Sequence, residues 1–283
     1  MKKISFDLTY EYLQEIRMAQ AVMESDFTLC IQPWQEIRLQ RLKDFFPSRY
    51  ELIQPGDQIT EISDILIAHR TVTPETRIGE LSRPLILPHA MLAYCRKMWQ
   101  EKRKYKYAFI GKITKARKIW MQSFLTSKVK GFMGLSGKVF IDYRIFAILS
   151  KVFTNFDRLL MTDSRRGREF PGKAWDDAYF RIQAQAEFII CPSGDVGCPW
   201  TYRFFEAMLC GAIPIVQSVS PCYEPFKFYT ADQKPEEFIY DQQMVEHNFR
   251  QCEKHLTVPI SELNKELTNL YTKKKTPENQ KEA

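Results

Sequence analysis

The chain has 283 residues, a formal net charge of +7, and 45% hydrophobic and 27% charged residues. This composition excludes a disordered chain, and the length allows two domains of about 100 to 150 residues with separate cores. No apolar stretch reaches the roughly 20 residues that a membrane-spanning helix requires. The seven cysteines form no Cys-x-x-Cys pair, which argues against a disulfide framework and a zinc site.

Residues 1–100 are predicted to form an N-terminal α/β domain. Apolar runs predict four strands, at Ile4–Leu8, Phe27–Ile31, Tyr50–Ile53 and Ile65–Ala68. Helical patterns and a further apolar run then predict a helix at Ile37–Phe46, a last strand at Arg83–His89 and a helix at Ala90–Gln100. The last helix leads to a basic linker at 101–104, where we place the domain boundary.

A second domain, residues 101–235, opens with the apolar strand Tyr107–Gly111 and a helix that runs through Leu125. Residues 101–138 contain eleven Lys or Arg and a single acid, Glu101. Such a positive band suits nucleic acid, anionic lipid head groups or the phosphates of a sugar nucleotide. A solvated basic face remains the simpler interpretation.

The segment 188–216 has the order strand, glycine loop, helix, turn and strand. The strand Phe188–Ile190 runs into a loop whose Gly194 and Gly197 let backbone amides approach a ligand closely. Pro199 then stands where a helix is expected to begin. This layout is typical of a phosphate-binding site, because a helix N-terminus offers unpaired amide donors to an anion.

Arg203 and Glu206 follow inside this helix at the spacing i, i+3, so they project from one face. A guanidinium neutralises phosphate through a fork of donors, and a carboxylate accepts hydrogen bonds from vicinal ribose hydroxyls. The pair therefore suits a nucleoside diphosphate. The alternative is a solvated ion pair on an ordinary helix, which contributes only a few tenths of a kcal/mol.

This segment is similar to the nucleotide-sugar motif of the exostosin-like glycosyltransferases, family 47. The matching positions are Pro192, Gly194, Arg203, Glu206-Ala207 and Gly211–Val216. The resemblance covers residues 104–228 and departs from the family where Thr201-Tyr202 replaces the usual Ser before the Arg. It implies the GT-B fold, an α/β architecture of two Rossmann-like domains with a cleft between them.

The resemblance implies an inverting glycosyltransferase, either a hexosyl- or a pentosyltransferase. The donor would be a nucleoside-diphosphate sugar, preferably a UDP sugar such as UDP-xylose or a UDP-hexose, and the acceptor a hydroxyl of an oligosaccharide or a glycoprotein glycan. The donor is a substrate, so no cofactor is expected. We predict no essential metal, because Asp176-Asp177 lies in a helical pattern rather than in an Asp-x-Asp motif. The implied donor-binding residues are Gly111, Lys112, Arg117, Lys118, Ser193, Gly194, Asp195, Arg203 and Glu206.

Inverting transfer also needs a general base for the acceptor hydroxyl. We expect it in the acceptor-side domain, in a loop after a strand, which nominates Asp7, Asp57 and His69. His69 and Asp57 rank first, although a hydrogen-bonded structural histidine is the simpler interpretation of His69.

Two alternatives from other classes remain open, a non-catalytic relative and a nucleic-acid-binding α/β protein that uses the 101–138 band. Tyr105, Tyr107 and Phe109 alternate with lysines, which suits base stacking. The same alternation fits a half-buried strand, and nucleic acid is the disfavoured partner. A catalytic cysteine is likewise disfavoured against small buried thiols near the loop; the cysteines concerned are Cys191, Cys198, Cys210 and Cys222.

Residues 236–270 are predicted as a C-terminal helix that crosses back to the N-terminal domain, as the GT-B resemblance implies. Residues 271–283 are polar and are predicted to be a disordered tail. No signal peptide or transmembrane segment is recognised. We therefore expect a cytoplasmic, soluble bacterial or viral member of the family, or a trimmed catalytic domain of a Golgi enzyme.

Overall fold

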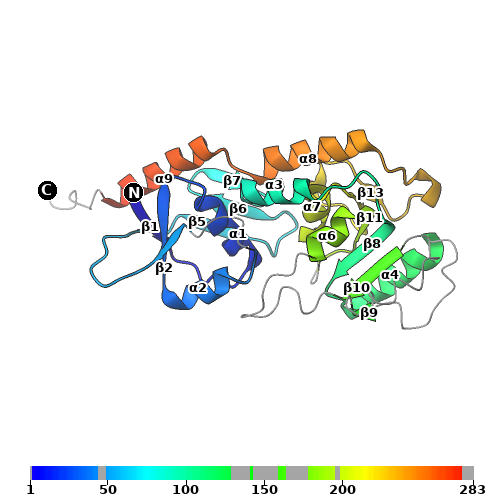
Figure 1. The fold of residues 1–283 in the computed structure, drawn as a ribbon, viewed down its shortest axis with the longest axis horizontal. Helices are drawn as coiled ribbons and strands as arrows, with labels where there is room; N and C mark the ends of the chain where they lie inside the picture. The colour runs from blue at the N-terminus through cyan, green and yellow to red at the C-terminus, as the bar shows by residue number, and fades with distance from the viewer. Residues whose placement is uncertain are drawn as a thin grey trace. The chain divides into compact units, whose positions relative to one another are not determined.

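The computed structural model describes residues 2–43, 49–128, 141–142, 159–163, 178–194 and 198–275 (Figure 1). The chain divides into two compact units. Among the described residues, unit 1 contains those up to Ala93 and those from Glu253 onward, and unit 2 contains those between. The division thus falls inside a helix, α3 (His89–Lys97), and not at the linker 101–104.

Unit 1 is built on a four-stranded parallel sheet. Its strand order is β3-β2-β1-β4, and α1 (Leu13–Val22) and α2 (Pro33–Leu39) connect its first three strands. The chain moves outward from β1 to β2 and β3 and then returns to the other side of β1. The strands are β1 (Lys2–Phe6), β2 (Phe27–Ile31), β3 (Tyr50–Leu52) and β4 (Thr60–Ile62).

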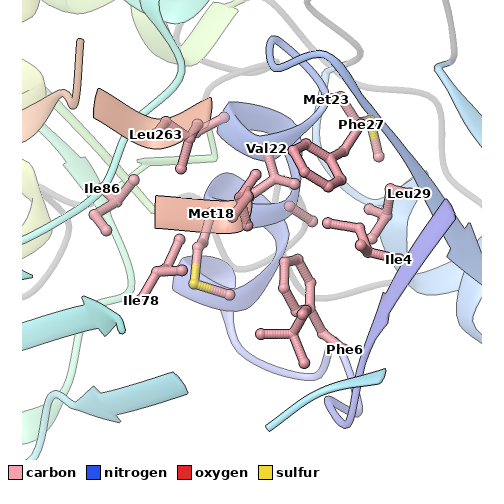
Figure 2. Packing of buried hydrophobic residues seen from close by; sticks show 14 of the residues in the cluster. Ile4, Phe6, Met18, Val22, Met23, Phe27, Leu29, Ile78, Ile86 and Leu263 are labelled. Atoms are coloured by element: carbon pink, nitrogen blue, oxygen red, sulfur yellow. The ribbon is translucent and has the colours of Figure 1, made fainter. Parts of the chain in front are cut away.

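A small antiparallel sheet and a C-terminal helix complete the core of unit 1. The sheet has the order β5-β6-β7, and the helix is α9. Figure 2 shows how Ile4 and Leu29 from the parallel sheet meet Met18 and Val22 of α1, and one buried cluster joins them to Ile78 of β6 and Leu263 of α9. The bounds are β5 (Ile65–Ala68), β6 (Glu75–Ile78), β7 (Leu81–Arg83) and α9 (Ile260–Lys275).

Helix α1 buries polar side chains as well as apolar ones. Gln14, Glu15, Arg17 and Gln20 are all at most 7% exposed. Gln14 Nε2 donates to the Ile86 carbonyl at 2.9 Å, which satisfies part of this buried polarity. A helix of this kind has no clean apolar stripe, and the sequence patterns did not predict it.

A carboxylate caps the N-terminus of α3. Glu24 Oε2 accepts the backbone amide of His89 at 3.0 Å, and Oε1 accepts that of Ala90 at 2.9 Å. These amides belong to the first turn of α3, where no intrahelical acceptor exists. We expect Glu24→Ala to destabilise the protein by about 1 to 2 kcal/mol, measured by chemical denaturation. Glu61→Ala, at an exposed position on β4, is the control, and equal stability of the two variants would contradict the capping role.

Unit 2 contains a six-stranded parallel sheet with the order β13-β12-β11-β8-β10-β9. The α/β fold class, with parallel sheets that resemble Rossmann-like domains, is confirmed; the cleft between domains stays a prediction. The strands are β8 (Tyr105–Gly111), β9 (Ile141–Asp142), β10 (Leu159–Asp163), β11 (Ala186–Cys191), β12 (Ile213–Val216) and β13 (Tyr229–Thr230). The helices of this unit include α4 (Lys115–Lys128), α6 (Ala178–Ala184), α7 (Tyr202–Leu209) and α8 (Gln242–Leu256), the last of which ends beyond the unit boundary.

Several element bounds differ from those predicted. Helix α2 begins at Pro33 and ends at Leu39, earlier than the predicted 37–46, and the end of that range lies outside the described residues. Residues 84–88 form no strand. The C-terminal segment forms two helices, α8 and α9, with Pro259 between them, and α9 continues to Lys275. Residues 271–275 are therefore helical and not part of a disordered tail.

The aromatic residues of β8 lie in the core of unit 2. Tyr105, Tyr107 and Phe109 are 8%, 0% and 0% exposed. Tyr107 and Phe109 pack in one cluster with side chains from α4, β11 and β12. These rings are not available for base stacking, so the prediction of an aromatic nucleic-acid platform on this strand is wrong.

Candidate functional site

The topology of unit 2 singles out the carboxyl ends of β8 and β11. From β8 the chain passes to β9 and β10 on one side, and from β11 it passes to β12 and β13 on the other. Neighbouring strands whose connections leave in opposite directions create a crevice at their carboxyl ends, where open α/β sheets bind ligands. The loops that follow Gly111 and Cys191 border this position.

Arg117 joins these two loops. Its Nε donates to the Ser193 carbonyl at 3.2 Å, and its Nη1 donates to the Lys112 carbonyl at 3.1 Å. Ser193 N in turn donates to Gln217 Oε1 at 3.1 Å. The predicted donor-binding residues Lys112, Arg117 and Ser193 are therefore close together, although Arg117 is occupied with backbone carbonyls.

Arg203 reaches the carboxyl end of β8 from helix α7. It belongs to the first turn of α7, is 6% exposed, and donates from Nε to the Ile110 carbonyl at 3.0 Å. Its guanidinium carbon is 4.3 Å from the centre of the Phe109 ring. A side chain at Gly111 would overlap Arg203 Nη2, so the glycine at the end of β8 is required for the arginine to reach this position.

The charge of Arg203 is not balanced within the described part of the chain. No ion pair there involves Arg203, and its Nη1 has no hydrogen-bond partner. A buried cation without a counter-charge is costly, because the desolvation of the ion is not offset. An anionic ligand at the carboxyl ends of β8 and β11 would offset that cost.

Glu206 is buried next to this position, one turn later on α7. It is 1% exposed, and its Oε2 accepts the hydroxyl of Tyr179 on α6. Arg203 and Glu206 are thus both buried, and the alternative of a solvated ion pair is wrong. Tyr179 was not predicted as a site residue; its place on the helix that precedes β11 was the only sequence signal for it.

Cys191, the last residue of β11, lies close enough to Arg203 and Glu206 for both charges to affect its thiol. Burial raises the pKa of its thiol to about 12, with Arg203 lowering it and Glu206 raising it. Burial likewise raises the pKa of Cys222 to about 11 and that of Cys210. These thiols remain protonated near neutral pH and are poor nucleophiles, which agrees with small buried fillers.

The glycine loop after β11 is only partly described. A side chain at Gly194 would approach the Trp200 carbonyl to 2.9 Å and the Cys198 carbonyl to 3.0 Å, so the loop needs a glycine there. Asp195 and Gly197 lie outside the described residues. Helix α7 begins at Tyr202 and has its N-cap at Thr201, so Pro199 precedes the helix and does not start it.

The three predicted bases occupy different places in unit 1. Asp7 is exposed and follows β1 at the carboxyl end of the parallel sheet. Asp57 lies between β3 and β4; the Gln54 amide (2.8 Å) and Lys3 Nζ (3.2 Å) both bond to it and lower its pKa. His69 Nε2 is 2.8 Å from Thr76 Oγ1. Asp7 directly follows its strand, whereas Asp57 comes five residues after β3 and is bonded to Lys3 near the start of β1.

The imidazole of His69 is held in its neutral form. Burial lowers its pKa to about 4, with a further lowering by Arg17 and an opposing effect of the Pro84 backbone. The ring is also half-buried, and its Nε2 is engaged with Thr76 Oγ1 rather than open to an acceptor hydroxyl. The hydrogen-bonded structural interpretation of His69 is therefore favoured.

This pKa predicts an acid-sensitive fold. The pKa of His69 in the folded protein lies below its ordinary value of 6.5, so the unfolded chain binds the proton more readily. The contribution of His69 to the free energy of unfolding is therefore fully present above pH 6.5 and is lost as the pH falls toward 4. The loss at pH 5 is about 2 kcal/mol. We expect the free energy of unfolding to change less between pH 7.5 and 5 in His69→Gln than in the unaltered chain. The control His247→Gln is expected to show the same change as the unaltered chain. An equally steep dependence in His69→Gln would contradict this assignment.

The basic band contains at least one structural cation. Arg103 is 6% exposed and donates to the carbonyls of Ala184, Cys210 (3.1 Å) and Gly211 (3.0 Å), at the ends of α6 and α7. Lys112 and Lys115 are exposed, and Lys118 is half-buried on α4. Residues 129–138 of the band lie outside the described residues.

No protein-family model and no curated protein matches the sequence. Among solved structures, the chain is similar to the crystal structure of the GtfA/B complex, with a TM-score of 0.35 and 14% sequence identity, over 88% of this chain and 46% of that chain. It thus spans less than half the length of the matched chain. The exostosin-like family therefore stays a resemblance carried by the motif at 192–216.

Two further observations concern metals and membranes. Within the described ranges, no group of three or more His, Cys, Asp or Glu side chains is placed to hold a metal ion. None of the helices in the described part of the chain is long and apolar enough to cross a membrane.

Proposed function

We propose that unit 2 binds the diphosphate of a nucleoside-diphosphate sugar, preferably a UDP sugar. The protein would transfer the sugar, with inversion, to a hydroxyl of a glycan acceptor, as a GT-B glycosyltransferase of the exostosin-like type. The buried, unbalanced guanidinium of Arg203 at the carboxyl ends of β8 and β11 carries this proposal.

The diphosphate fits the donors available around Arg203. A guanidinium binds phosphate oxygens through charge-assisted hydrogen bonds, which are stronger than neutral ones. Gly111 makes room for the Arg203 guanidinium at the end of β8, and Lys112, the next residue, adds an exposed cation. Glu206 is the proposed acceptor for the ribose hydroxyls, and its Oε2 already accepts the hydroxyl of Tyr179.

We assign the general base to Asp7. Asp57 is bonded to Lys3, and His69 is half-buried and bonded to Thr76, so both are less accessible to an acceptor hydroxyl than the exposed carboxylate at the carboxyl end of β1. In the transfer, the acceptor oxygen bonds to the anomeric carbon as the bond from that carbon to the diphosphate oxygen breaks. The hydroxyl proton passes to Asp7, and Arg203 balances the charge on the departing diphosphate.

The first test is binding of UDP, GDP, ADP and CMP, measured by thermal shift and calorimetry. We expect UDP to raise the melting temperature, because a ligand that binds only the folded state stabilises it by mass action. No shift with any nucleotide, in a protein that melts cooperatively, would contradict the proposal. Binding without turnover of UDP-xylose, UDP-glucose or UDP-N-acetylglucosamine would instead indicate a non-catalytic relative.

The second test concerns the base and the metal. We expect Asp7→Asn to lower kcat by about 100- to 10,000-fold with an unchanged Kd for UDP, whereas Asp57→Asn and His69→Gln keep most of the activity. Removal of divalent metal with EDTA is expected to leave the rate unchanged. Full activity of Asp7→Asn would move the base to another residue.

A further inference from the structure

A second surface of interest lies at the carboxyl ends of β1 and β2 in unit 1. The loop 7–12 follows β1, and α2 follows β2. Side chains of α2 bind the backbone of this loop: Gln35 Nε2 donates to the Leu8 carbonyl and Arg38 Nη1 to the Thr9 carbonyl, each at 2.6 Å. The two segments therefore form one fixed surface at the edge where open α/β sheets bind ligands.

The backbone of this loop is strained. Tyr10 has a φ of 53°, in the left-handed region that bulky residues seldom adopt, and its side chain is fully buried. Among the described non-glycine residues it alone has a positive φ. Such strain persists only where the surrounding structure enforces it, and it is concentrated at functional sites. The hydrogen bonds from α2 supply that enforcement.

This surface carries large apolar side chains that remain exposed. Trp34 is 50% exposed, Ile37 on the same helix is 51% exposed, and Tyr12 in the loop is 54% exposed. The guanidinium carbon of Arg38 is 5.0 Å from the centre of the Trp34 ring, and Arg38 Nη2 is 3.2 Å from Glu11 Oε1. The Trp34 ring is thus in contact with a cation, Arg38, that is itself paired with a carboxylate, Glu11.

We infer that Trp34 is a stacking platform for a sugar ring of the acceptor glycan. A pyranose has an apolar C–H face, which suits the negative face of an aromatic ring, and a rim of hydroxyls, which Arg38 and Glu11 can bind. The inference rests on the proposed function in calling this glycan the acceptor. Asp7, the proposed base, belongs to the same loop 7–12, so the acceptor and the base would share one structural element.

A protein partner fits this surface less well. A stable protein interface buries about 800 Å² on each side, which is more than three half-exposed side chains offer. These side chains are also interspersed with the charged Glu11 and Arg38, whereas the centre of a protein interface is depleted in charged residues.

The test is binding of a panel of neutral oligosaccharides to the full chain without donor. The panel contains β-1,4-linked xylose, glucose and N-acetylglucosamine oligomers and an α-1,4-linked glucose oligomer. Binding is measured by calorimetry and by saturation-transfer NMR. We expect at least one oligomer to bind, Trp34→Ala to weaken it about 10-fold or more, and Trp34→Phe to retain most of the affinity. Ile239→Ala, which alters an exposed apolar residue of unit 2, is the control.

Two outcomes would overturn the inference. One is that no oligosaccharide binds, or that Trp34→Ala binds as tightly as the unaltered chain. The other is that sedimentation shows a dimer that Trp34→Ala converts to a monomer, because the surface would then bind a second copy of the chain. UDP binding is measured on the same samples. Glycan binding without nucleotide binding would refute the proposed function and support the glycan site. Nucleotide binding without glycan binding would support the proposed function and refute the glycan site.

Discussion

Arg203→Met is expected to weaken UDP binding by about 100-fold or more while the ligand-free protein remains as stable as the unaltered chain, within about 1 kcal/mol. The methionine keeps an apolar side chain of similar length against Phe109. It removes a buried charge that forms no ion pair among the described residues and whose Nη1 lacks a hydrogen-bond partner, and this gain offsets the lost bond to the Ile110 carbonyl. Calorimetry and chemical denaturation measure the two quantities.

The stability measurement decides the role of this arginine. A residue that serves structure alone would lower the melting temperature when it is removed, and nucleotide binding would fall only in proportion to unfolding. Arg181→Met is the matched control, because it removes one arginine from an exposed position of unit 2. Full UDP binding in Arg203→Met would refute the proposed diphosphate site.

Arg103→Met is expected to have the opposite effect, with a loss of stability of about 3 to 5 kcal/mol. The substitution removes the Arg103 donors from the Ala184, Cys210 and Gly211 carbonyls, of which Gly211 keeps the hydroxyl of Tyr240. It also removes a cation from the C-terminal ends of two helices, where positive charge is favourable. For a protein of this size we expect the melting temperature to fall by roughly 8 to 15 °C.

A neighbouring lysine provides the control for this effect. Lys102 is exposed in the same linker, and Lys102→Met removes the same charge without the buried contacts. We expect its melting temperature to stay within about 1 °C of that of the unaltered chain. Equal losses in the two variants would show that net charge, and not the contacts with the carbonyls, accounts for the effect of Arg103.

Local patterns predicted several strands accurately. Phe27–Ile31 and Ile65–Ala68 were predicted with the bounds that the structure shows, because short apolar runs flanked by polar residues favour strands wherever they are placed. The order of strand, loop, helix and strand at 188–216 was also predicted, since glycine and proline mark its turns. In contrast, α1 was not predicted, because its buried Gln14, Arg17 and Gln20 interrupt the apolar stripe that identifies an amphipathic helix.

The sequence by itself determined the α/β class and the place of Arg203 on the helix after β11, because apolar periodicity and the positions of glycine and proline indicate the type and order of the elements. Only the tertiary structure decided that Arg203 is buried against Gly111, that Tyr179 binds Glu206, and that Arg103 caps two helices. These contacts join residues that are distant in sequence. Burial, which the packing of strands and helices creates, then determines whether a charged side chain is solvated, structural or available to a ligand.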